Sequence, residues 1–229
     1  MLHIGIVACS TEGAALCYRT VSLEGAKKLG RHDHPEVSLH SFSLAQYMKS
    51  IDSGDWAGVA ELMLASAEKV AKAGADFLIC PDNTIHQAFD LVEHRSPRPW
   101  LHIAREVATE AKRCGYKRLA VLGTRYLMEG PVYPETLKAA GVEYRMPSAV
   151  ERERINQIIF DELVNGHILP RSLSYYVEVI RALKDEGCDA VVLGCTEIPL
   201  LVTPESSPLP TLDSTRLLAR AAVQKAIEG

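Results

Sequence analysis

Two polar triplets stand at matched positions in the two halves of the chain. Residues 74–84 (GADFLICPDNT) align with residues 187–197 (GCDAVVLGCTE), and each segment runs from a helix end through Gly, Asp and a buried strand to its triplet. The triplets are Asp82-Asn83-Thr84 and Cys195-Thr196-Glu197. In parallel α/β sheets, ligands bind at the carboxyl ends of the strands, where backbone N–H groups attract anions. Chemistry is therefore expected at the triplets, with Asp82 and Cys195 approaching one substrate from the two halves.

Cys195 is the side chain best suited to acid–base or covalent chemistry. It follows an apolar strand and stands at a predicted helix start, where the positive end of a helix favours the thiolate. A single loop of this kind would be explained by helix capping and turns, but the matched register of two such loops favours a site. Four other cysteines are expected to be buried and inert: Cys9, Cys17, Cys114 and Cys188.

The composition excludes several other classes of function. The chain has 25 Lys and Arg against 29 Asp and Glu, and no stretch concentrates positive charge, so nucleic acid is not an expected partner. The first apolar run, residues 2–9, is too short for a membrane span and lacks a signal-peptide cleavage site, which predicts a cytoplasmic protein.

No metal or cofactor is expected. The chain has no C-x-x-C pair, and no glycine-rich nucleotide motif follows a strand. The segment His32-Asp33-His34 holds potential metal ligands, but it lies in a polar stretch before a proline and is interpreted as a solvated loop.

The order of elements predicts an α/β fold of two similar parallel-sheet domains, because short β-branched runs alternate with longer amphipathic stretches. The expected strands are 3–8, 37–42, 77–80, 118–123, 142–145, 190–194 and 211–212. The expected helices are 12–29, 56–73, 84–93, 101–114, 131–140, 149–165, 172–186 and 214–227. Proline-rich breaks at 96–99 and 204–210 divide the chain. They predict a first domain at residues 1–97 plus 211–229 and a second at residues 98–210.

Four motifs in order along the chain resemble the aspartate/glutamate racemase family, whose members act without pyridoxal phosphate. The motifs are Asn83-Thr84-x-His86, residues 122–133 (LGTRYLMEGPVY), residues 194–199 (GCTEIP) and residues 213–222 (DSTRLLARAA). The resemblance extends over nearly the whole chain. It implies pseudo-twofold symmetry between the domains, an active site in the cleft between them, and a homodimer.

The resemblance also implies a cofactor-independent racemase or epimerase that acts on aspartate, glutamate or a related small amino acid. Its two-base mechanism places one acid on each face of the substrate Cα, here Asp82 and Cys195. The implied substrate ligands are polar side chains of the loops after the strands: Ser10, Asn83, Thr84, Thr124, Thr196 and Glu197.

One position departs from the family pattern. The family's first cysteine is replaced by Asp82, and Cys80 lies two residues earlier, on the strand side of Pro81. A carboxylic acid is a stronger acid than a thiol, so the pair is unequal unless burial weakens the acid. Two alternatives therefore stay open: a decarboxylase or cis–trans isomerase of a small dicarboxylate that uses Cys195 alone, and a catalytically impaired amino-acid-binding homologue.

Overall fold

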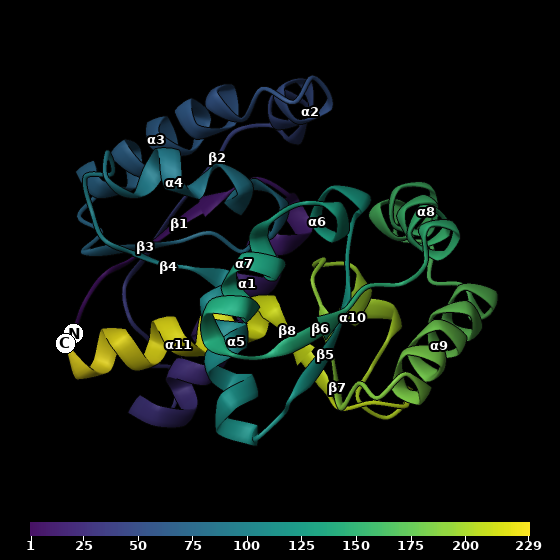
Figure 1. Ribbon diagram of the computed structural model, residues 1–229. Helices are drawn as coiled ribbons and strands as arrows, with labels where there is room; N and C mark the ends of the chain where they lie inside the picture. Colours follow the sequence, from purple (N-terminus) through teal and green to yellow (C-terminus); the bar gives the residue numbers. More distant parts are fainter. The chain divides into compact units, whose positions relative to one another are not determined.

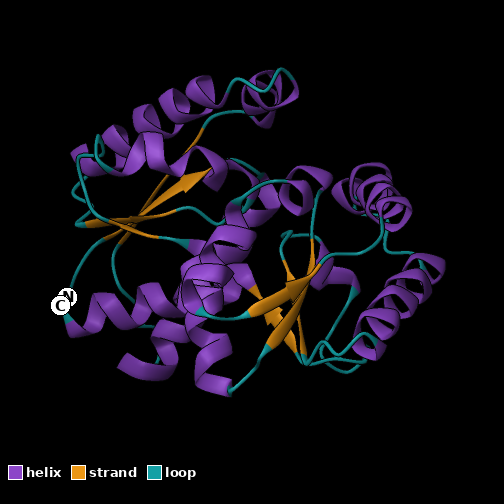
Figure 2. Ribbon diagram, viewed as in Figure 1, coloured by secondary structure: helices purple, strands orange, loops and turns teal.

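The computed structural model describes residues 1–229 and arranges the strands in two parallel sheets of four strands each (Figures 1 and 2). The chain divides into two compact units. Unit 1 comprises Met1–Ile103 and Thr215–Gly229, and unit 2 comprises Ala104–Ser214. The predicted α/β class with parallel sheets is confirmed. None of the helices combines the length and the apolar character needed to cross a membrane.

Unit 1 is built on a sheet with the strand order β2-β1-β3-β4. Its strands are β1 (Ile4–Ala8), β2 (Val37–Ser41), β3 (Phe77–Ile79) and β4 (Trp100–Leu101). Its helices are α1 (Thr11–Leu29), α2 (Leu44–Asp52), α3 (Trp56–Lys72), the 3-10 helix η1 (Thr84–Ala88), α4 (Phe89–Glu93) and α11 (Ser214–Glu228).

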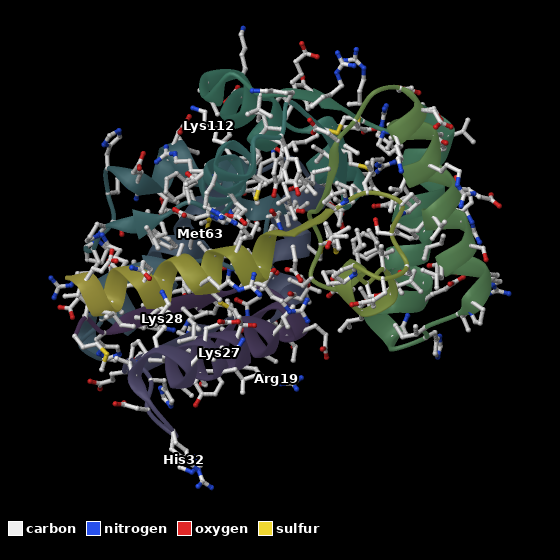
Figure 3. The ribbon with its side chains drawn as sticks, turned by 90° about the horizontal axis from the view of Figure 1, so that it is seen from below. Arg19, Lys27, Lys28, His32, Met63 and Lys112 are labelled. Carbon is white, nitrogen blue, oxygen red and sulfur yellow. The ribbon has the colours of Figure 1, made fainter.

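Both faces of the unit 1 sheet are covered because its central strands are apolar on both sides. Ile4, Ile6 and Ala8 of β1 pack with residues of α1 and α11, whereas Val7 packs with α3. This two-sided burial is typical of parallel sheets between helices. Figure 3 shows α11 lying along α1, where Lys28 donates a hydrogen bond to Gln224 and Arg220 forms an ion pair with Glu24.

Unit 2 repeats this plan with the strand order β6-β5-β7-β8. Its strands are β5 (Arg118–Leu122), β6 (Glu143–Arg145), β7 (Ala190–Leu193) and β8 (Thr211–Asp213). Its helices are α5 (Ile103–Cys114), α6 (Arg125–Glu129), α7 (Val132–Ala140), α8 (Ala149–Gln157), a π turn η2 (Ile158–Glu162), a 3-10 turn η3 (Leu163–Asn165), α9 (Pro170–Asp185) and α10 (Ile198–Leu201).

The unit 2 core lies between the central strands and the helices α8 and α9, which stand on one side of this sheet in Figure 1. Alternate residues of β5 and β7 point into it: Ala120, Leu122, Val191 and Leu193. The α9 helix contributes residues at helical spacing: Tyr176, Val179, Ile180 and Leu183. This spacing places one apolar face of α9 on the sheet.

The two units anchor their central strands in the same way. Asp76, just before β3, accepts a hydrogen bond from the backbone N–H of His3 (2.8 Å). Asp189, just before β7, accepts hydrogen bonds from the backbone N–H groups of Lys117 (2.6 Å) and Arg118 (3.2 Å). These aspartates occupy equal positions in the sequence repeat, so the repeat corresponds to a repeated structure.

Several local expectations were wrong. The expected helix over 149–165 is helical throughout, but it changes from α to π at Ile158 and to 3-10 at Leu163, and Glu162 of the π turn is bound by Ser172 and Arg171 of α9. Cys114 is exposed rather than buried, because it lies at the polar end of α5. Four short elements were not expected from the sequence: α2, α6, α10 and β4.

Candidate functional site

In unit 1, Asp82 is bound to the loop that follows β1. Its Oδ2 atom accepts a hydrogen bond from the backbone N–H of Cys9 (3.0 Å), and its Oδ1 atom accepts one from the N–H of Ser10 (3.1 Å). The loops can meet because β1 and β3 are paired parallel neighbours. Two N–H donors at the start of the long helix α1 favour the ionised carboxylate. Asp82 is half-buried in this position.

Ser10 is the N-cap of α1, as its side-chain oxygen accepts a hydrogen bond from the N–H of Gly13 (3.1 Å). An N-cap serine satisfies one backbone donor of the first helical turn. The hydroxyl oxygen is therefore engaged as an acceptor, while its hydrogen can still be donated. The structure thus places two predicted site residues, Ser10 and Asp82, in direct contact through the backbone of Ser10.

Cys80 is fully buried beneath this loop. Burial raises the pKa of its thiol well above the usual range, and the neighbouring Asp82 charge adds to the effect. Its Sγ atom is a weak donor to the backbone carbonyl of Asp82 (3.8 Å). A thiol with this environment stays protonated at neutral pH and is a poor base.

His86 contacts the backbone of Asp82. Its Nδ1 atom lies 2.9 Å from the carbonyl oxygen of Asp82, and its Nε2 atom accepts a hydrogen bond from the N–H of Ile103 (3.4 Å). These partners assign the neutral tautomer with the proton on Nδ1. Asn83 is buried and Thr84 is half-buried at the start of η1, so the triplet forms one continuous turn after β3.

In unit 2, Gly123 and Gly194 let the ends of β5 and β7 approach each other closely. The N–H of Gly194 donates to the carbonyl of Leu122 (2.7 Å), and a Cβ at Gly194 would lie 2.9 Å from that same oxygen. This approach brings the loop with Thr124 beside the loop with Cys195. Thr124 is buried and is the N-cap of α6, since its side chain accepts a hydrogen bond from the N–H of Leu127 (3.3 Å).

Glu197 binds both of the residues that precede it. Its Oε2 atom accepts hydrogen bonds from the Cys195 thiol (2.9 Å) and from the Thr196 hydroxyl (2.8 Å). Glu197 and Thr196 are buried, each with 5% of its surface exposed, and Cys195 is partly exposed. A thiol that donates to a carboxylate is held in its protonated form.

The sequence predicted that a helix starts at Cys195, and this position was wrong. The α10 helix begins at Ile198 and has a single turn, which supplies little aligned dipole. A helix dipole therefore contributes little at Cys195, whose thiol donates its hydrogen bond to Glu197.

The two units hold complementary acid–base groups at the carboxyl ends of their central strands. Unit 1 holds a carboxylate whose bonds favour the charged base, and unit 2 holds a thiol whose bond favours the neutral acid. No group of three or more His, Cys, Asp and Glu side chains is arranged to bind a metal ion. The exposed His32 projects away from the rest of the fold (Figure 3).

Sequence reasoning missed three residues that line these loops. His86 lies in the Asn83-Thr84-x-His86 motif, but the sequence alone predicts no role for it. The other two are Tyr47 and Tyr176, which are fully buried and occupy core positions of α2 and α9. Both tyrosines occupy helix positions that face the core, where an apolar residue would also fit, and this was the only sign in the sequence that their hydroxyls could matter.

Comparisons with known proteins agree on one family. Residues 6–222 match the family described as Asp/Glu/Hydantoin racemase. The broad specificity amino-acid racemase RacX of Bacillus subtilis is 24% identical over 195 residues, which cover 83% of this chain and 82% of that protein.

Two crystal structures share the whole architecture. A Yersinia pestis protein provisionally named as an Asp/Glu racemase is 32% identical with a TM-score of 0.92, and the match covers 99% of this chain and 100% of that one. An aspartate racemase homologue from Pyrococcus horikoshii OT3 is 28% identical with a TM-score of 0.85, with the same coverage.

Proposed function

Because the chain belongs to the Asp/Glu/hydantoin racemase family, we propose that it racemises or epimerises a small amino acid without a cofactor. The observation that carries this proposal is the pair of opposite hydrogen-bond environments in the two units. Two backbone N–H groups donate to the Asp82 carboxylate, which favours its charged form, and the Cys195 thiol donates to Glu197, which favours its neutral form. A racemase of the two-base type needs one base and one acid at the start of each turnover.

In the proposed reaction, each unit contributes one of these groups to a single substrate. The Asp82 carboxylate takes the proton from Cα, and the electron pair of the broken C–H bond passes into the substrate carboxylate. The Cys195 thiol then delivers its proton to the opposite face of Cα and becomes a thiolate. In the reverse direction, the Cys195 thiolate is the base and the Asp82 carboxylic acid is the donor.

The planar intermediate needs hydrogen-bond donors for its growing negative charge. Side chains of the right type lie in the loops that carry the two groups or in the neighbouring loops of the same units: Ser10, Asn83, Thr84, Thr124 and Thr196. We assign them to the substrate carboxylate and its charge; the Thr196 hydroxyl, which here donates to Glu197, takes this role by turning from Glu197 to the substrate. Glu197 acts through Cys195, which it orients and keeps protonated.

The substrate is proposed to be aspartate, glutamate or a related small amino acid. The names of the relatives support this class, since they include an aspartate racemase homologue and a broad specificity amino-acid racemase. The cytoplasmic location and the homodimer expected from the sequence stay predictions.

Exchange of the Cα proton in D₂O tests the proposal directly. The protein is incubated with single L-amino acids, and deuterium at Cα is measured together with the enantiomer ratio. Deuterium incorporation with inversion is the expected result for aspartate, glutamate or a related amino acid.

Two other outcomes contradict racemisation. Exchange without inversion would mean that one base works alone, as in the single-cysteine alternative. The absence of exchange with every amino acid would favour a binding protein. The Cys195→Ala variant serves as the control for exchange that does not depend on the site.

A further inference from the structure

His86 is a buried histidine whose two ring nitrogens bind two separate segments of the main chain. Its Nδ1 atom lies 2.9 Å from the carbonyl oxygen of Asp82, and its Nε2 atom accepts a hydrogen bond from the backbone N–H of Ile103 (3.4 Å). A carbonyl oxygen can only accept, so the bond to Asp82 requires the proton on Nδ1. The imidazole therefore connects the loop after β3 with the start of α5.

The Ile103 end of this connection is an anchor. Ile103 is the first residue of α5, and its side chain is fully buried in the core cluster that contains the central residues of β1 and β3. The N–H groups of a first helical turn have no partner within the helix, so an acceptor such as Nε2 of His86 satisfies one of them. The imidazole is thus attached to a buried point of unit 1.

Aromatic packing holds the imidazole in one orientation. Phe89 stacks on the ring of His86, with the ring centroids 5.7 Å apart and the planes 16° from parallel. His102 meets the same ring edge-on, with the centroids 4.6 Å apart, and also contacts Phe89. A side chain that is locked by its neighbours can hold another group precisely. Nδ1 of His86 consequently stays directed at the carbonyl of Asp82.

Holding the Asp82 carbonyl fixes the groups next to it. A peptide group is planar, so the carbonyl of Asp82 and the N–H of Asn83 can only turn together. At the other end of the same residue, the Asp82 carboxylate accepts hydrogen bonds from the N–H groups of Cys9 and Ser10. Both bonds depend on the direction in which the side chain leaves the backbone. The backbone conformation of Asp82 therefore decides where its carboxylate lies.

We propose that His86 is a positioning residue, which holds the Asp82 carboxylate in place for proton transfer by donating a hydrogen bond from Nδ1 to the Asp82 carbonyl. The proposal rests on the racemase function, in which Asp82 is the base of unit 1. His86 contacts no reacting atom and transfers no proton. Its effect is preorganisation, since a base that is displaced even slightly from the substrate loses much of its rate advantage.

Two amide substitutions separate the two bonds of the imidazole. The side-chain NH₂ of His86→Asn can take the place of Nδ1 and donate to the Asp82 carbonyl, but this side chain is too short to reach Ile103. The longer side chain of His86→Gln places its amide oxygen near the position of Nε2, where it can accept from Ile103, and leaves no donor at the position of Nδ1. Both variants lose the aromatic ring, so the loss of packing is matched.

Backbone hydrogen exchange, followed by NMR, tests the position of Asp82 without any turnover. The N–H groups of Cys9 and Ser10 report on it because they donate to the carboxylate. Both should exchange about tenfold faster in His86→Gln than in His86→Asn, the factor expected for one hydrogen bond of ordinary strength. The N–H of Ile6, in the central strand β1, reports on global unfolding and should exchange equally in the two variants.

The rate of Cα proton exchange tests the connection with the reaction. Because Asp82 acts in the chemical step, kcat should be about tenfold or more lower in His86→Gln than in His86→Asn, with similar KM values. If the parent protein exchanged no amino acid at all, the proposed function would fail. The backbone measurement would still show whether His86 holds Asp82, so the two failures are distinguishable.

Three results would overturn the proposal. Equal exchange of the Cys9 and Ser10 amides in the two variants would mean that the bond to the Asp82 carbonyl does not hold the carboxylate. Loss of Ile6 protection in either variant would mean that His86 stabilises unit 1 as a whole. A difference in KM with equal kcat would mean that His86 acts on substrate binding instead of on Asp82.

Discussion

The Oδ1 atom of Asp82 lies 3.1 Å from the backbone nitrogen of Ser10, so a side chain after β3 fastens the first turn of the helix after β1. The second carboxylate oxygen makes the equivalent bond to Cys9. Asp82 therefore has a structural role as well as the catalytic role proposed for it. Any substitution at this position changes both.

The Asp82→Cys variant separates the two roles. A second thiol matches Cys195 in acid strength, so racemisation should increase about tenfold or more. The thiol cannot accept both N–H bonds, so the free energy of unfolding should fall by about 1–3 kcal/mol. Chemical denaturation and the rate of racemisation measure the two effects.

Asp82→Asn is the matched control for Asp82→Cys. It keeps one acceptor oxygen but no base, so it should lose less stability and gain no racemisation. If Asp82→Cys left the activity unchanged while Cys80→Ser abolished it, Cys80 would be the first base and the assignment of Asp82 would fail.

Cys195→Ala should reduce Cα proton exchange by a factor of about 100 or more, the usual contribution of a positioned acid or base. The loss arises because Cys195 is the thiol of the matched triplet in unit 2. Cys114→Ala, which removes an exposed thiol, should leave exchange near the parent rate. Near-normal turnover in Cys195→Ala would contradict the proposed mechanism.

Glu197→Gln should let iodoacetamide alkylate Cys195 at a lower pH, which mass spectrometry of the labelled protein measures. The Glu197 carboxylate accepts a hydrogen bond from the Cys195 thiol, and its charge repels a negative charge on Sγ. Both effects favour the neutral thiol over the thiolate. Their removal should lower the pH midpoint of alkylation by about one unit. Glu178→Gln on the exposed side of α9 changes the net charge equally and should have no effect.

Alkaline stability should report on Cys188. Burial raises the pKa of its thiol from the ordinary value of 9.0 to about 11. The folded state then holds the proton more tightly than the unfolded state, so stability is lost as the pH rises from about 9 to about 11. Cys188→Ala should reduce the slope of the free energy of unfolding against pH by up to about 1.4 kcal/mol per pH unit in this range. Denaturation series at several pH values measure the slope, and an equal slope in both proteins would refute the assignment.

The sequence predicted the longer elements well because their patterns are strong. An unbroken apolar run located β7, and residues at helical spacing located α3. The α2 helix was missed because only Tyr47 and Ile51 of its nine residues are buried, which leaves a weak apolar stripe. The β4 strand has two residues after a proline-rich segment and offers no pattern at all.

The sequence predicted which loops form the candidate site, but it did not predict the hydrogen bonds between their residues. The repeat pointed to both triplets because each follows an apolar strand. The bonds from Cys9 and Ser10 to Asp82 depend on the pairing of β1 with β3, and local sequence does not specify which strands become neighbours. Burial of Tyr176 follows from the pattern of α9, but whether its hydroxyl finds a partner depends on atoms from other elements.

The anchors at Asp76 and Asp189, together with the identical strand orders, have an evolutionary consequence. These repeated features are expected if the gene of an ancestor half as long was duplicated and the two copies were fused. Such an ancestor would have placed the same residue at both of the positions proposed to be catalytic, as two copies of one gene product must. After fusion, each copy could mutate alone. The aspartate at position 82 and the cysteine at position 195 are then divergent descendants of one ancestral residue, and the difference between the two loops arose after the duplication.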